Sequence, residues 1–119
     1  MSAFDRDRRG YYYKVRFEAG ETFFVSFRYP AYFDNPVWQI TPGDGAEIEV
    51  HGTVALEPED ADWIEHHTYP TIKEAVADNE NLAVRHLRFT VTGAGGVFHL
   101  TTLQSVSIGS SPADLSLQR

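Results

Sequence analysis

The sequence predicts a small, mainly β domain of the α+β class, and two observations predict it. Several short segments alternate apolar with polar residues, which is the period of a strand with one buried face. Clusters of glycine and proline separate these segments, as turns separate neighbouring strands. At 119 residues the chain has the length of one ordinary domain. We expect that domain over residues 10–108, between a mobile N-terminal arm at 1–9 and a flexible C-terminal tail at 109–119.

The opening third of the domain predicts a β-hairpin rich in aromatic residues. Residues 11–17 and 23–29 each carry an apolar residue at alternate positions. The turn at 19–21 contains a glycine, and the two apolar faces coincide when Phe17 lies opposite Phe23. This register leaves a three-residue loop, which is a common hairpin type.

Two further strands are predicted before the middle of the chain. Residues 37–41 follow a proline and predict a short edge strand. After the turn sequence at 42–45, residues 46–56 show the clearest alternation in the chain. The residues that we expect to face inward from this longer strand are Ile48, Val50, Val54 and Leu56.

Capping signals then predict two short helices. Pro58 suits the first position of a helix over 58–67, and acidic residues follow it near the positive end of the helix dipole. Thr71 and Glu74 have the spacing of a capping box, which indicates a second helix over 71–79.

The last third predicts a second hairpin. Residues 86–92 and 97–102 alternate around a glycine-rich loop, with Val91 opposite Phe98, and a last strand segment follows at 104–108. The resulting order of elements is that of an OB-fold, a small antiparallel β-barrel with its helix between the third and fourth long strands. A strongly curved antiparallel sheet with one helical segment packed on it, a small α+β roll, fits nearly as well.

The charge of the chain is unevenly distributed. The net charge of −7 divides into +2 over residues 1–29, −11 over 30–81 and +2 over 82–119. Such an acidic centre repels phosphate backbones, so duplex DNA is not an expected partner. The sequence has no cysteine and no apolar run long enough for a membrane helix, so we expect a cytoplasmic protein without a membrane contact.

The outward face of the opening hairpin is the first candidate binding surface. Aromatic and basic side chains are interleaved there, at Tyr12, Lys14, Arg16, Phe24 and Arg28. Single-stranded nucleic acids are bound by this combination, because bases stack on rings while cations follow the backbone. The alternative is a solvated strand face on which the stems of Arg and Lys cover the rings, with Phe24 under a loop or in a dimer contact.

Two further surfaces are candidates. Tyr32, Phe33 and Trp38 exceed what the predicted core needs, so they line a ligand pocket or interaction patch, or else plug one end of a barrel. The second is an acidic face that binds a basic partner or mimics nucleic acid; its alternative is a solvated strand followed by a helix N-terminus. The residues of this acidic face are Glu47, Glu49, Glu59, Asp60 and Asp62.

Signatures of catalysis are missing from the sequence. It has no nucleophile elbow, phosphate-binding loop or dinucleotide fingerprint, and its five histidines lack the spacing of a metal site, so we predict neither cofactor nor metal. We expect a non-catalytic module that binds a protein partner, with a second copy of the chain among the candidates. The alternatives are a domain that binds single-stranded nucleic acid and a small enzyme with a pocket around Trp38, His51 and Trp63.

Overall fold

A computed structural model of the protein describes residues 11–28, 36–43, 45–72, 76–79 and 84–110, which form β-strands joined by turns and one short 3₁₀ turn, η3. The elements are β1 (Tyr11–Phe17), β2 (Thr22–Phe27), β3 (Val37–Pro42), β4 (Ala46–Thr53), η3 (Asp60–Asp62), β5 (Ile64–Ile72), β6 (Val76–Asn79), β7 (His86–Thr92), β8 (Gly96–Thr102) and β9 (Val106–Gly109).

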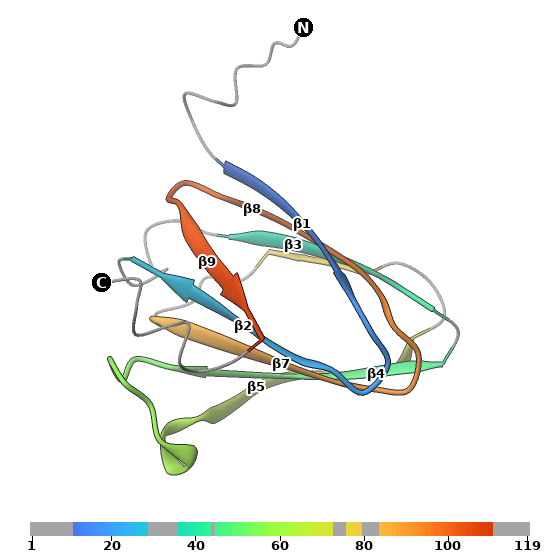
Figure 1. Ribbon diagram of the computed structural model, residues 1–119, viewed down its shortest axis with the longest axis horizontal. Coiled ribbons are helices and arrows are strands. Elements are labelled where there is room, and N and C mark those ends of the chain that lie inside the picture. Colours follow the sequence, from blue (N-terminus) through green and yellow to red (C-terminus); the bar gives the residue numbers. More distant parts are fainter. Residues whose placement is uncertain (1–10, 29–35, 44, 73–75, 80–83, 111–119) are drawn as a thin grey trace, which may run out of the picture.

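The strands form two antiparallel sheets that face each other (Figure 1). Sheet A has four strands in the order β1-β8-β3-β6, and sheet B has five in the order β5-β4-β7-β2-β9. The orders 1-8-3-6 and 5-4-7-2 are those of a jelly roll, in which eight strands are divided between two sheets by Greek-key connections. β9 extends sheet B beside β2. The fold is therefore an open β-sandwich, and the predicted OB-like closed barrel is wrong.

Aromatic rings fill the space between the sheets. Phe23, Phe89 and Phe98 form a cluster with ring centroids 4.8–5.2 Å apart. The rings of Trp38 and Phe89 pack edge to face, and Nε1 of Trp38 donates a hydrogen bond of 3.0 Å to the hydroxyl of Tyr69. Rings of this size bury a large apolar area each, and such burial is the main stabilising term of a small domain.

Neither predicted hairpin forms. β1 pairs with β8, and β2 pairs with β7 and β9, so the first two strands lie in different sheets. Phe17 and Phe23 do meet, with ring centroids 5.7 Å apart, but they meet across the core. β7 and β8 are likewise divided between sheets B and A, so Val91 and Phe98 are not paired. Alternation identifies the inward face of each strand, but two strands can present that face to one core from the same sheet or from opposite sheets.

The predicted helices are also wrong. Residues 58–67 contain only the 3₁₀ turn of η3, after which β5 begins, and residues 76–79 form β6. In this turn the Glu59 N–H donates to the Asp62 carboxylate at 2.8 Å, and Pro58 precedes the turn instead of occupying its first position. Pairing of β5 with β4 then overrides the weak local preference for a helix. The described part of the chain contains no helix long and apolar enough to cross a membrane.

Other strand predictions are closer to the structure. Trp38 and Ile40 share the buried face of β3, as predicted, but β3 lies between β8 and β6 and is not an edge strand. The last strand forms as β9. β4 ends at Thr53, whose hydroxyl accepts the Ala55 N–H at 3.1 Å, so Val54 and Leu56 are exposed instead of inward-facing. The predicted arm at 1–9 and residues 111–119 of the predicted tail lie outside the described residues.

Candidate binding face

The outer face of sheet A is open to solvent along three adjacent strands. The register places Tyr12 beside Thr101, Lys14 beside His99 and Arg16 beside Val97. On the other side of β8, β3 adds one residue to each pair: Val37 lies beside Thr101, Gln39 beside His99 and Thr41 beside Val97. We call the nine outward-facing residues of these strands the sheet A face: Tyr12, Lys14, Arg16, Val97, His99, Thr101, Val37, Gln39 and Thr41.

The sheet A face is locally positive in an acidic protein. Lys14 and Arg16 are both exposed, and none of the nine residues is a carboxylate. The whole chain, by contrast, has a net charge of −7. Charges more than about 10 Å away are largely screened at 0.1 M salt, so a ligand on this face meets the local cations more strongly than the distant acids.

An aromatic pair occupies one corner of the face. Tyr12 is 57% exposed, and its ring stacks on that of His99 with centroids 5.9 Å apart and planes 20° apart. The Tyr12 hydroxyl and Nδ1 of His99 also share a hydrogen bond of 2.6 Å. A large side chain at the surface is thereby held in one orientation, which lowers the entropic cost of binding a ligand against it.

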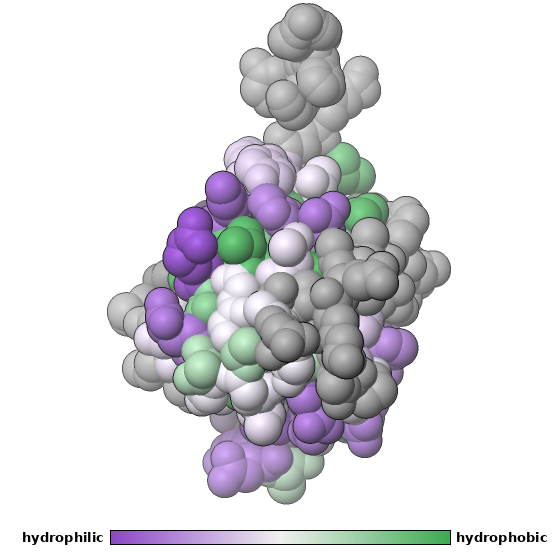
Figure 2. Space-filling model, turned by 90° about the vertical axis from the view of Figure 1, so that its right-hand side faces the viewer, coloured by the Kyte–Doolittle hydropathy of each residue, from purple (hydrophilic) through white to green (hydrophobic). Residues whose placement is uncertain are grey.

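The face continues into a shallow hollow of about 430 Å³ at the end of the sandwich where the β1–β2, β3–β4 and β7–β8 turns meet. Its walls include Arg16, Glu18 and Thr41 together with three glycines. Glycine is required at position 95, because a Cβ there would lie 2.4 Å from the Phe17 carbonyl oxygen. Figure 2 looks at this end and shows pale residues of intermediate hydropathy near its centre, with hydrophobic residues directly beside them and hydrophilic residues farther out.

Sheet B has a different outer face, because the segment 54–63 folds back over it. The Leu56 carbonyl lies 3.1 Å from Nε2 of His86, and the Trp63 ring packs on Phe24 at 5.8 Å. The guanidinium of Arg88 lies 4.9 Å from the centre of the Trp63 ring, in a cation–π contact. We call residues 54–63 the strap. It leaves Phe24 only 5% exposed.

Seven carboxylates from the described part of the chain's middle lie on this same side. Some belong to the strap and the others to the outward positions of β4 and β5. They are Glu47, Glu49, Glu57, Glu59, Asp60, Asp62 and Glu65. The two outer faces of the sandwich thus differ in charge, positive on sheet A and negative on sheet B.

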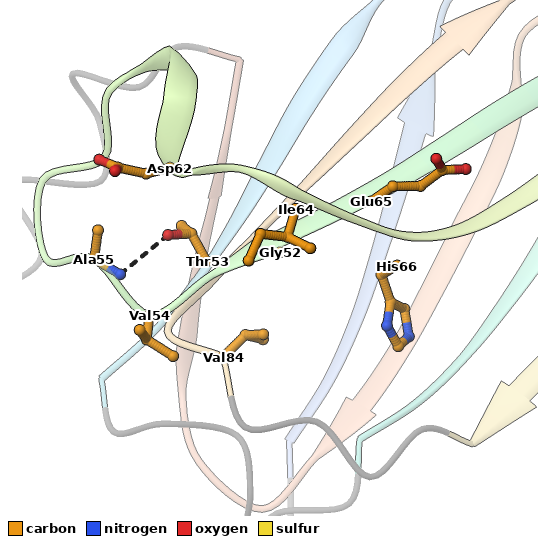
Figure 3. Close-up of a pocket in the computed structure, with 9 residues that line it drawn as sticks. All are labelled: Gly52, Thr53, Val54, Ala55, Asp62, Ile64, Glu65, His66 and Val84. Carbon is orange, nitrogen blue, oxygen red and sulfur yellow. Dashed lines mark hydrogen bonds between the residues drawn. The ribbon is translucent and has the colours of Figure 1, made fainter.

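A second hollow, of about 390 Å³, lies beside the end of β4 and the start of β5 (Figure 3). Its walls are largely apolar, with Val54, Ile64 and Val84 turned toward one space. Asp62 and His66 lie at its margin, and the Glu65 carboxylate points away and accepts the Thr68 hydroxyl at 2.8 Å. Among the described residues, no three His, Asp or Glu side chains are placed to share a metal ion.

The structure divides the residues predicted for the hairpin surface. Tyr12, Lys14 and Arg16 do share a face, while Phe24 lies on the other sheet beneath Trp63, as the alternative interpretation expected. Arg28 is exposed just beyond β2. The sequence interpretation missed His99 and Gln39, because only the neighbouring strands reveal that their outward positions adjoin Lys14.

The structure also places residues of the other predicted surfaces. Trp38 is a fully buried core residue, so the aromatic patch expected there is wrong for this residue, and Tyr32 and Phe33 lie outside the described residues. The predicted acidic residues do lie on one side of the molecule. Trp38, His51 and Trp63 do not surround a pocket, because Trp38 lies between the sheets and the other two lie over the outer face of sheet B.

Comparisons with known proteins support the fold alone. No family model matches the chain, and no curated protein matches its sequence. Part of a putative α-L-fucosidase from Bacteroides thetaiotaomicron superposes with a TM-score of 0.51 and 9% identity, over 79% of this chain but only 22% of the fucosidase. Weaker matches are a Yersinia pseudotuberculosis-derived mitogen (TM-score 0.44, 6% identity, 81% of this chain and 86% of the mitogen) and RmlC from Streptococcus suis (0.42, 7%, 88% and 49%). At these identities, the first match indicates that this sandwich architecture occurs within a larger protein.

Proposed function

We propose that this domain is a non-catalytic interaction module that binds an acidic segment of a protein partner on the sheet A face. The observation that supports this most directly is the combination of exposed Lys14 and Arg16 with a fixed Tyr12–His99 pair on a face whose nine residues include no carboxylate. The core between the sheets supports the same view, because aromatic rings occupy the space where a jelly roll could hold a small ligand.

The strength of such a contact follows from its exposure. Exposed ion pairs contribute about 0.2–1 kcal/mol each and weaken as salt rises. Two such pairs and one aromatic contact give modest affinity, which is the range of transient recognition. The strap adds selectivity, because its carboxylates repel an acidic ligand from the opposite side of the sandwich and direct it to sheet A.

The acidic face has a place in the same proposal. Four of its carboxylates are exposed on the sheet B side, where they could contact a basic surface of the partner: Glu49, Glu59, Asp60 and Asp62. Contacts of this kind at the rim of an interface chiefly raise the association rate. We therefore assign the acidic face a supporting role and the sheet A face the specific contact.

Single-stranded nucleic acid is the second candidate for the sheet A face. The stacked Tyr12–His99 pair favours it, since bases stack on rings in a sequence-tolerant way. It ranks second because Phe24 lies on sheet B, so the sheet A face has one aromatic pair. Successive bases of a single strand would stack on several aromatic side chains.

The test compares two probes with matched variants. A glutamate-rich peptide and an oligothymidylate are titrated by calorimetry at low and high ionic strength. We expect the peptide to bind at low salt, and the Lys14→Glu and Arg16→Glu variants to bind it much more weakly. Arg28→Glu is the control, because Arg28 is an exposed cation beyond the face. Equal loss in the control, or no peptide binding at low salt, would refute the proposal, and preference for the oligothymidylate would favour the second candidate.

A further inference from the structure

β1 is an edge strand with an unbroken ladder on one side. Its seven residues pair with β8 in continuous register from Tyr11 opposite Thr102 to Phe17 opposite Gly96. The strand contains no proline, and in the described part of the chain no strand pairs with its other edge. Alternate backbone N–H and C=O groups on such an edge lack strand partners, and they form a template for a further strand.

The core is incompletely covered at this same edge. Five apolar residues pack against the core while staying only partly buried, and four of them belong to β1 and β9. These four are Tyr13, Val15, Val106 and Ile108. The two strands adjoin here, because the Val106 N–H donates to the Tyr13 hydroxyl at 2.8 Å. Tyr11, with the same inward parity as Tyr13, is 50% exposed.

We propose that the free edge of β1 binds an extended segment of the protein partner as an additional strand of sheet A. This deepens the proposed function and rests on it. Side chains of an added strand alternate between the two faces of the sheet. Those on the outer face lie beside Tyr12, Lys14 and Arg16, and those on the inner face lie beside Tyr13 and Val15. The segment therefore alternates acidic with apolar residues, over about the length of β1.

Charge favours a different partner over a second copy of the chain. Two β1 strands paired antiparallel, with all seven residues matched, would place Lys14 directly opposite Lys14 of the second copy. Like charges at opposed positions destabilise a strand pair, and a lysine on an edge strand is a known protection against self-association. The same lysine attracts a strand that carries a carboxylate at this position.

Alternating backbone methylation provides the test. The probe is a soluble peptide with a seven-residue Glu-Val repeat, the length of β1, and two derivatives are N-methylated at every second residue in opposite phase. Only one phase removes the N–H groups that point toward β1, because these alternate along a strand. We expect the parent and one derivative to bind, and the other derivative to lose at least about tenfold in affinity, equivalent to roughly 1.4 kcal/mol. Hydrogen exchange of alternate β1 amides should slow in the complex.

The outcomes separate this inference from the proposed function. Equal affinity of the two derivatives, with no slowing in β1, would overturn strand addition while leaving an acidic ligand on the sheet A face. Binding of the glutamate-rich peptide without binding of the Glu-Val peptide would likewise overturn strand addition and leave the proposed function in place. If neither peptide binds at low ionic strength, both the inference and the proposed function are wrong.

Discussion

Tyr12 and His99 stack across the β1–β8 pair, with their rings nearly parallel and a hydrogen bond of 2.6 Å between the hydroxyl and Nδ1. The two residues are 87 positions apart in the sequence and become neighbours only through the jelly-roll order of the strands. Their contact fixes the one large exposed ring among the nine residues of the sheet A face.

Replacing this ring should weaken ligand binding without unfolding the domain. Tyr12→Ala removes the stacking surface, so the affinity for the acidic peptide should fall by about 0.5–1.5 kcal/mol, whereas Tyr12→Phe keeps most of it. Because Tyr12 is 57% exposed, the urea midpoint should change little in either variant. Calorimetric titration checks the affinities. Similar losses in both variants would instead assign the effect to the hydroxyl.

The Trp38–Tyr69 hydrogen bond makes a prediction about stability. In Tyr69→Phe the ring remains, but the buried Nε1 of Trp38 loses its acceptor, which should cost about 1–3 kcal/mol of the free energy of unfolding. Urea denaturation followed by tryptophan fluorescence measures the loss. Tyr12→Phe serves as the control, because its hydroxyl lies at the exposed surface. A midpoint unchanged from wild type would show that Trp38 finds another acceptor.

The strap should open when its anchor is removed. Trp63→Ala deletes the ring that covers Phe24 and faces Arg88, and we expect a loss of about 2–4 kcal/mol in the free energy of unfolding. Limited proteolysis should then cut within residues 54–63 faster than in the wild type. Trp63→Phe retains an aromatic ring, so its free energy of unfolding and its rate of cleavage should lie between those of the wild type and Trp63→Ala. Proteolysis at the wild-type rate would indicate that the Leu56–His86 contact alone holds the strap.

Two glycine positions should respond to alanine for different reasons. A Cβ at Gly95 would lie 2.4 Å from a backbone oxygen, so Gly95→Ala requires the backbone to move and should cost more than about 2 kcal/mol. Gly20 has open space around it but a φ of +76°, so Gly20→Ala should cost only about 1 kcal/mol. Thermal unfolding of both variants tests this order, and a reversed order would contradict the close approach at Gly95.

The residues that face inward from each strand could be predicted from sequence far better than the pairing of one strand with another. Alternation correctly identifies Phe23, Val25 and Phe27 as core residues, because burial depends on local parity. The pairing of β1 with β8 is a global property, and no local signal distinguishes an arch between sheets from a tight hairpin. Phe24 shows the same limit, since its polar-face position is buried by Trp63 from a distant loop.

The candidate binding face was predicted in part for the same reason. Lys14 and Arg16 belong to one strand, so their shared orientation follows from their spacing. His99 joins them only once β8 is known to be the neighbour of β1. The helices predicted over 58–67 and 71–79 fail because cross-strand pairing supplies more stabilisation than a few capping residues do.

The pairing of β1 with β8 also has a consequence for biosynthesis. Tyr11 meets Thr102, a separation of 91 residues, so β1 can pair with β8 only after all the strands between them have been synthesised. Non-local pairings of this kind make folding slow, on the order of milliseconds to seconds. During that interval a segment with three consecutive tyrosines stays unpaired, and Lys14 and Arg16 within it oppose premature aggregation of nascent chains.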